Sequence, residues 1–190
     1  MATQSIANLK STAQALMEQS PAGFKTLTTY CAVLDFIHQN IWEGACHGSS
    51  SVLATLLSVQ GVQPTLCLGE VFHSNVYFDH SWVEVHGEVL DAAISRTLIH
   101  GFAFPPVFRG RDLSTKNATA LEYGKPSGQG YDVHANWIRN VTVFDYMALF
   151  PEHPDGLFGI AKIIGKAINL RVTLPSLQEH ARSLTWTERP

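Results

Sequence analysis

The sequence lacks several features that define common classes of protein. Its 13 lysines and arginines against 16 acidic residues give a formal net charge of −3, and no basic cluster interrupts this balance. Nucleic acid is therefore a poor candidate as a partner. No apolar run approaches the roughly 20 residues that span a bilayer, so no membrane span is expected. The N-terminal segment also lacks the basic and apolar regions of a signal peptide, which favours a cytoplasmic protein and leaves open export without such a signal.

Cysteine is scarce, and its spacing fits neither a zinc site nor a disulfide framework. The three cysteines, Cys31, Cys46 and Cys67, form no CxxC pair, and no HExxH motif occurs. We therefore expect no metal and no cofactor. An odd number of cysteines is typical of a reducing compartment, where each thiol is either buried or reactive.

The composition itself is that of a globular protein. Apolar residues make up 45% and charged residues 15% of the 190 residues, without an internal repeat or a low-complexity tract. We expect a single domain over residues 1–190 with a sizeable core. Nothing in the chain indicates its oligomeric state.

Hydrophobic periodicity predicts helices at the start of the chain and strands after them. The expected helices cover the first 20 residues, about 27–39, and a segment from Cys46 that closes at Gly61. The expected strands are 65–72, 80–85 and 88–94, and His86-Gly87 between the last two indicates a hairpin. Residues 133–150 fit either strand or helix, and Asp155 is expected to cap a final helix that runs to about residue 170.

Cys46 lies in the segment Gly44-Ala45-Cys46-His47-Gly48-Ser49-Ser50, where a loop enters a predicted helix. A thiolate there faces the unpaired N–H groups and the positive end of the helix dipole, which lower its pKa. The same N–H groups can hold an oxyanion that forms beside the sulfur. Small, polar neighbours favour a reactive role for Cys46. Inert packing is expected for Cys31 and Cys67, which lie in apolar periodic segments.

The predicted hairpin places a base and a carboxylate on one face of a sheet. A thiolate nucleophile needs a base, and the base needs a partner that orients it. If His86-Gly87 is the turn, Trp82 opposes Asp91, and His80 lies on the same face as Asp91. Such diagonal neighbours lie roughly 7–8 Å apart at the backbone, which these side chains can close. A one-residue slip in register would put them on opposite faces.

The order of these features resembles the transglutaminase-like branch of the papain-like cysteine hydrolases. The features are Gly-x-Cys, an apolar helix ending in Gly61-Val62-Gln63-Pro64, a strand ending near Gly69, His80-Ser81-Trp82-Val83-Glu84-Val85 and Leu90-Asp91. The resemblance covers residues 44–94. It implies an α+β fold whose papain-like or transglutaminase-like core packs the nucleophile helix on an antiparallel sheet, between N-terminal helices and a C-terminal extension. It also implies that Cys46 is the nucleophile, His80 the general base and acid, and Asp91 the orienting carboxylate.

Two further features bear on the expected site. Family members often carry a larger or basic residue after the cysteine and Ala between His and Trp, where this chain has His47 and Ser81. The papain branch places Gln about six residues before the cysteine to assist the oxyanion, and Asn40 or Gln39 is the candidate here. His47 and Trp82 are further candidates for contacts with the oxyanion or the substrate.

Residues 101–190 match no family pattern known to us and form the extension. Within it, residues 112–130 are polar and contain glycine, which predicts a long loop or lid.

Two classes of function fit these residues. The preferred hypothesis is hydrolysis of a peptide or protein amide through a thioester, as in a thiol protease, amidase or deamidase. An amine acceptor in place of water would make the protein a transglutaminase or another acyltransferase, and the triad does not choose between them. The alternative is a catalytically inactive scaffold that binds a peptide. The presence of Cys, His and Asp at workable spacing counts against that alternative.

Overall fold

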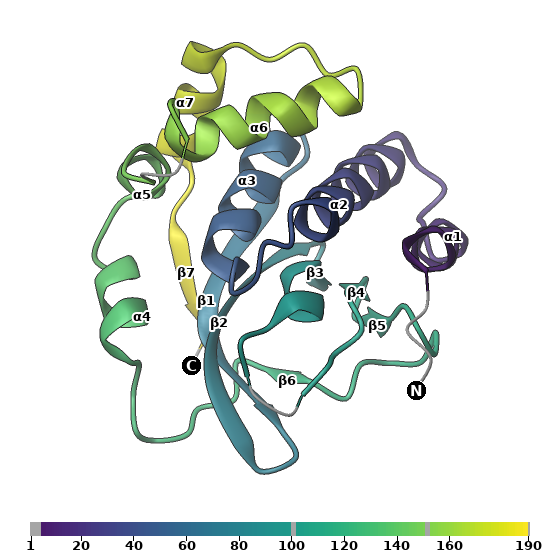
Figure 1. Ribbon diagram of the computed structural model, residues 1–190, viewed down its shortest axis with the longest axis vertical. Helices are drawn as coiled ribbons and strands as arrows, with labels where there is room; N and C mark the ends of the chain where they lie inside the picture. The colour runs from purple at the N-terminus through teal and green to yellow at the C-terminus, as the bar shows by residue number, and fades with distance from the viewer. Residues whose placement is uncertain (1–4, 100–101, 151–152, 190) are drawn as a thin grey trace.

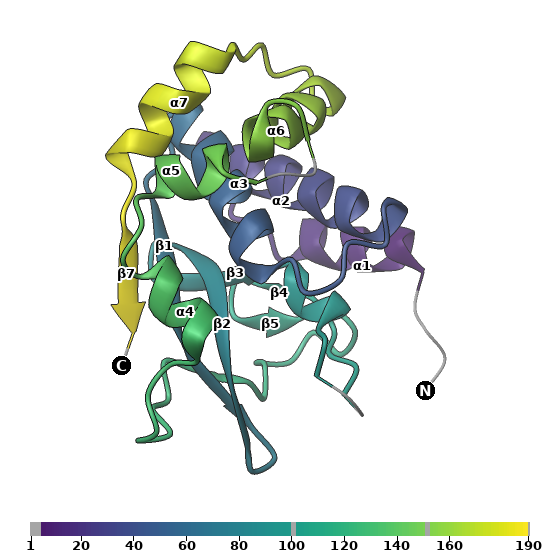
Figure 2. The same ribbon diagram turned by 60° about the vertical axis from the view of Figure 1, so that its left-hand side comes forward.

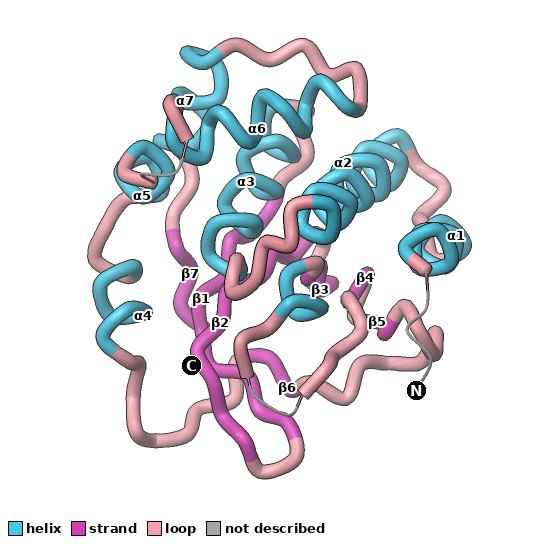
Figure 3. Tube along the Cα trace, in the orientation of Figure 1, coloured by secondary structure: helices cyan, strands magenta, loops and turns pink. Residues whose placement is uncertain are grey.

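The computed structural model describes residues 5–99, 102–150 and 153–189, and it has the expected α+β architecture (Figures 1 and 3). Its helices are α1 (Ile6–Ala15), α2 (Pro21–Gln39), α3 (Cys46–Val59), α4 (Val133–Ile138), α5 (Val143–Ala148), α6 (Gly156–Ala167) and α7 (Leu174–Ser183), with a 3₁₀ turn η1 (Ala93–Arg96). Its strands are β1 (Pro64–His73), β2 (Val76–Val85), β3 (Glu88–Asp91), β4 (Val107–Phe108), β5 (Arg111–Asp112), β6 (Glu122–Tyr123) and β7 (Trp186–Arg189). No helix in the described ranges has the length and apolarity to cross a bilayer.

All strands join one sheet in the order β5-β4-β3-β2-β1-β6, with β7 also paired to β1. The pairing is antiparallel except between β1 and β7, which run parallel. The β1–β2 hairpin extends beyond the other strands (Figure 1). Its turn, Ser74 and Asn75, has positive φ at both residues. The predicted strand 65–72 covers most of β1, whereas the predicted strand 80–85 misses the first four residues of β2.

The second hairpin has the predicted turn. His86 and Gly87 have φ of 54° and 77°, the two left-handed residues of a turn that matches the twist of antiparallel strands. The ladder runs from Val85↔Glu88 to Val83↔Leu90 in the expected register, but it stops before the expected pair of Trp82 and Asp91. The predicted strand 88–94 is too long, because β3 ends at Asp91 and η1 follows. The edge of β2 that precedes Val83 consequently has no β3 partner, and a gap opens in the sheet at His80.

Helix α3 lies at the centre of the molecule and packs on β1 and β2, with α2 beside it and α6 and α7 above it (Figure 2). It is buried on nearly every side, since Leu53, Leu56 and Leu57 are at most 2% exposed and serines at its start are buried too. A helix enclosed in this way is held by packing all round. One of these serines forms a hydrogen bond to the sheet: the Ser50 hydroxyl donates to the carbonyl oxygen of Ser81, 2.9 Å away. This bond joins the start of α3 to β2.

The structure settles one open prediction about the extension and corrects two about the helix ends. Residues 133–150 form two short helices, capped by the side chains of Asp132 and Thr142. Asp155 stands at the start of α6, but its carboxylate bonds to Lys162 at 3.0 Å and does not cap the helix. Helix α2 starts earlier than expected, at Pro21, because Ser20 caps it.

The segment 112–130 is not one uninterrupted loop. Glu122 and Tyr123 form β6 and pair with β1, and Leu121 before them is buried. Leu121 and Tyr123 pack with the apolar side chains on the face of the sheet opposite α3. The expected long loop or lid over residues 112–130 is therefore interrupted by β6, which attaches it to the sheet.

Candidate active site

Cys46 is the first residue of α3, and the loop before it is held close to η1. Gly44 has φ of +66°, and its N–H donates to the carbonyl oxygen of Arg96 at 2.9 Å. The left-handed backbone at Gly44 favours glycine, and a Cβ there would also displace the end of the Leu98 side chain, whose Cδ1 would lie 2.5 Å away. Ala45, at the N-cap, supplies no side chain to the first turn of α3. The N–H groups of that turn therefore point to the space beside the sulfur.

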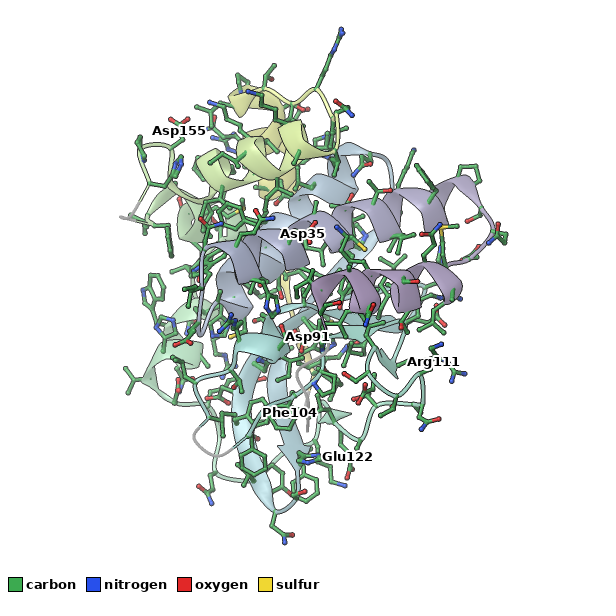
Figure 4. The ribbon with its side chains drawn as sticks, turned by 45° about the vertical axis from the view of Figure 1, so that its right-hand side comes forward. Asp35, Asp91, Phe104, Arg111, Glu122 and Asp155 are labelled. Atoms are coloured by element: carbon green, nitrogen blue, oxygen red, sulfur yellow. The ribbon has the colours of Figure 1, made fainter. Side chains whose placement is uncertain are left out.

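His80 and Asp91 meet in the gap between β2 and β3. His80 Nε2 lies 2.7 Å from Asp91 Oδ2, and the Asp91 side chain has no exposed surface. Two further groups hold this carboxylate: the Tyr123 hydroxyl donates to Oδ2 at 2.8 Å, and the N–H of Ile94 donates to Oδ1 at 3.1 Å. Figure 4 shows Asp91 in the middle of the molecule, beneath the helices. The carboxylate is thus fixed from three directions.

The Cys46 sulfur lies between two imidazoles. Burial raises the pKa of the Cys46 thiol, but the charges and hydrogen bonds of His47 and His80 outweigh it and hold that pKa well below its usual value. For His80 burial lowers the pKa, and the Asp91 carboxylate and the Cys46 thiolate together raise it to about 10. Because His80 Nε2 faces Asp91, Nδ1 is the nitrogen left for the sulfur. Both directions favour a thiolate beside an imidazolium at neutral pH.

His47 is placed as a second neighbour of the thiolate. It is 7% exposed, and its Nδ1 lies 2.7 Å from the hydroxyl of Ser81 on β2. Its ring also contacts His134 and Trp186, with centroids 5.4 and 6.4 Å away. The two residues at which the chain departs from the family pattern, His47 and Ser81, therefore bond to each other. This contact was not predicted from the sequence, because nothing in the sequence marks His47 and Ser81 as partners.

Replacing His47 by Asn tests its influence on the sulfur. The amide of Asn can still reach Ser81, but the imidazole that stabilises the thiolate is removed. We expect the pKa of Cys46 to rise, so that the midpoint of a pH profile of iodoacetamide labelling moves to higher pH. His134→Asn is the matched control, because His134 contacts the His47 ring but does not contribute to the thiol pKa. An unmoved midpoint in the His47 variant would contradict this role.

The other sequence candidates fall into different places. Asn40 lines a cavity beside Cys46, although its amide already donates to the carbonyl oxygen of Phe36 at 2.8 Å. Gln39 lines a separate groove between α1, α2 and α6, because successive residues at the end of a helix point in different directions. Gln39 is therefore not brought to Cys46. Trp82 is 1% exposed and packs against Tyr123 with ring centroids 5.0 Å apart, so it supports the site from the core.

Tyr123 is the site residue that sequence reasoning missed. Its one signal was an aromatic residue in an otherwise polar segment, which does not indicate a partner for a distant Asp. The other two thiols lie in surroundings that suppress reactivity: burial raises the pKa of Cys31 to about 11 and that of Cys67 to about 12. Within the part of the chain that the structure describes, no cluster of His, Cys, Asp or Glu is arranged to hold a metal ion.

Comparison with known families places this geometry in context. Residues 2–101 match the family described as the transglutaminase-like superfamily, over just more than half of the chain. The chain belongs to the transglutaminase-like superfamily. Proteins of this superfamily are generally enzymes that use a cysteine nucleophile for acyl transfer or hydrolysis. The match contains Cys46, His80 and Asp91 and ends where the extension begins. No match was found among curated proteins or among solved structures.

Proposed function

We propose that this transglutaminase-like protein hydrolyses an amide bond of a peptide or protein through a thioester on Cys46. In this mechanism His80 is the general base and acid, and Asp91 orients it. The observation that carries the proposal is the buried 2.7 Å bond between His80 and Asp91, on an imidazole that also lowers the pKa of Cys46. A sulfur, an imidazole and a carboxylate linked in this order are the arrangement that nucleophilic catalysis needs.

The reaction proceeds in two halves. The Cys46 thiolate attacks the amide carbonyl, a C–S bond forms, and the N–H groups at the start of α3 stabilise the oxyanion. The C–N bond then breaks, and the leaving amine takes the proton of the His80 imidazolium. Water attacks the thioester and gives a proton to His80, and the acid leaves as the C–S bond breaks. The raised pKa of His80, about 10, supports the first half because the imidazole carries its proton at neutral pH.

Detection of the thioester tests this function. The protein is incubated with a panel of peptide amides, the reaction is quenched with acid, and the intact mass of the protein is measured. We expect a mass gain equal to the acyl group, which is absent in Cys46→Ala and is released by hydroxylamine. Addition of a primary amine distinguishes the acceptors, because hydrolysis gives the free acid and transglutamination gives a new amide. If no peptide or protein amide acylates Cys46, the scaffold hypothesis is favoured.

A further inference from the structure

A cavity of about 850 Å³ opens beside the nucleophile. Its floor is the start of α3, where Ala45, His47 and Gly48 line it on either side of Cys46. Gly48 leaves room for the ring of Trp42, which also lines the cavity, because a Cβ at position 48 would lie 2.9 Å from Cζ2 of that ring. The walls are aromatic and aliphatic, and they include Trp42, Trp137, Tyr146 and Leu149.

Three of the eight large apolar side chains that are exposed among the described residues line this cavity. Ile41, Trp137 and Leu149 are 66%, 43% and 63% exposed. Large apolar residues that cluster on a surface usually mark a binding site. No lysine or arginine is among the described residues that line the cavity. Its one carboxylate, Glu43, lies 3.8 Å from the guanidinium of Arg96. The lining also contains the imidazoles of His47, His134 and His153 and the amide of Asn40, and its aromatic and aliphatic walls are the part that suits an apolar group.

The position of His80 decides which part of a substrate the cavity receives. The leaving amine must lie beside His80, which gives it a proton, and His80 does not line the cavity. The acyl part of the amide, which is bonded to the sulfur, extends in another direction. Cys46 itself does not line the cavity, but its neighbours Ala45, His47 and Gly48 do, which leaves the cavity to the acyl side of the substrate.

Part of the wall lies beyond the family match over residues 2–101: His134 and Trp137 come from α4, Tyr146 comes from α5, and Leu149 directly follows α5. These helices are fastened to the sheet by the segment around them. The N–H of Asp132 donates to Asp79 Oδ2 at 2.7 Å, and the Tyr131 hydroxyl donates to the carbonyl oxygen of Leu68 at 3.3 Å. Arg139 lies 3.1 Å from Glu188 on β7. A wall held in this way is a preformed feature of this chain.

We propose that this cavity binds a large apolar side chain, aromatic or branched, on the acyl side of the amide, so that α4 and α5 select the substrate. The inference rests on the proposed function, because it needs an acyl group on Cys46. It assigns a role to the extension: the family-matched part supplies the reacting groups, and the extension supplies the specificity.

Peptidyl vinyl sulfones test this selection, since the Cys46 thiolate adds to their vinyl carbon without a leaving group. The probes carry Phe, Leu, Ala or Lys at either of the two residues next to the vinyl group, and labelling is followed by intact mass. At one of these positions we expect Phe or Leu to react about 10- to 100-fold faster than Ala, from the burial of the larger side chain. Lys should be no better than Ala.

Variants separate the cavity from the chemistry. Trp137→Ala and Leu149→Ala should reduce the Phe-to-Ala ratio several-fold, after each rate is divided by that variant's iodoacetamide rate. Phe24→Ala is the matched control, because Phe24 is 61% exposed on α2 and does not line the cavity. Equal rates for all probes, with Cys46 still reactive to iodoacetamide, would overturn the cavity proposal alone. A Cys46 inert to iodoacetamide and to every probe would overturn both proposals.

Discussion

At about pH 6, iodoacetamide is expected to alkylate Cys46 at least about 100-fold faster than Cys31 or Cys67. With pKa values of about 11 and 12, only about one Cys31 thiol in 10⁵ and one Cys67 thiol in 10⁶ is ionised at this pH. The pKa of Cys46 is lowered, so its thiolate persists there. A low-pKa thiolate is a weaker nucleophile, which offsets about half of this advantage on a logarithmic scale.

Peptide mapping after timed labelling measures the three rates. The pH dependences should also differ: because the pKa of Cys46 is lowered, its rate should fall less steeply than those of the other two thiols as pH falls from about 8 to 6. The rates of Cys31 and Cys67 should fall about tenfold for each unit over the same range. Comparable labelling of all three thiols at low pH would contradict the thiolate–imidazolium pair.

Replacing Asp91 by Asn is expected to reduce acyl transfer by on the order of 10³–10⁴-fold. The carboxylate accepts from His80, Tyr123 and the N–H of Ile94, whereas an amide has one accepting oxygen. If that oxygen faces His80, the amide N–H₂ opposes the N–H of Ile94. In the reverse orientation the amide N–H₂ donates to His80 Nε2, so the neutral imidazole carries its proton on Nδ1. Nδ1 then cannot accept a proton from the Cys46 thiol.

Single-turnover acylation by the best amide of the panel measures this loss, and thermal unfolding confirms that the variant is folded. Tyr123→Phe is the matched comparison. It removes one hydrogen bond to the same oxygen but leaves the carboxylate, so we expect a loss of about tenfold. If Asp91→Asn acylated at the normal rate, Asp91 would have no orienting role.

The hairpin shows how far local pattern can predict a site. The turn His86-Gly87 requires two left-handed residues and fixes the register, and the shared face of His80 and Asp91 follows from the two-residue period of a strand. The helix start at Cys46 was equally predictable from small residues before an apolar run. These features depend on neighbours a few positions away, which the sequence displays directly.

The remaining parts of the site depend on contacts between distant residues. Tyr123 reaches Asp91 across 32 positions, and His47 reaches Ser81 across 34. Nothing in the spacing of either pair marks them as partners. The choice between Gln39 and Asn40 depended on where α2 ends and how it turns, since one residue changes the direction of a side chain by about 100°. Such choices are decided by packing, which periodicity does not encode.

Strand β7, which pairs in parallel with β1, is synthesised after the residues of the proposed site that it supports. Its Trp186 packs beside His47 and Tyr146, and its Glu188 holds Arg139 of the segment after α4. A nascent chain that has emerged only as far as α7 already carries Cys46, His80 and Asp91, yet it lacks this support. Pairing over so long a separation forms late in folding. The contacts that β7 makes with His47, Tyr146 and Arg139 are therefore added only after the three proposed catalytic residues have been synthesised.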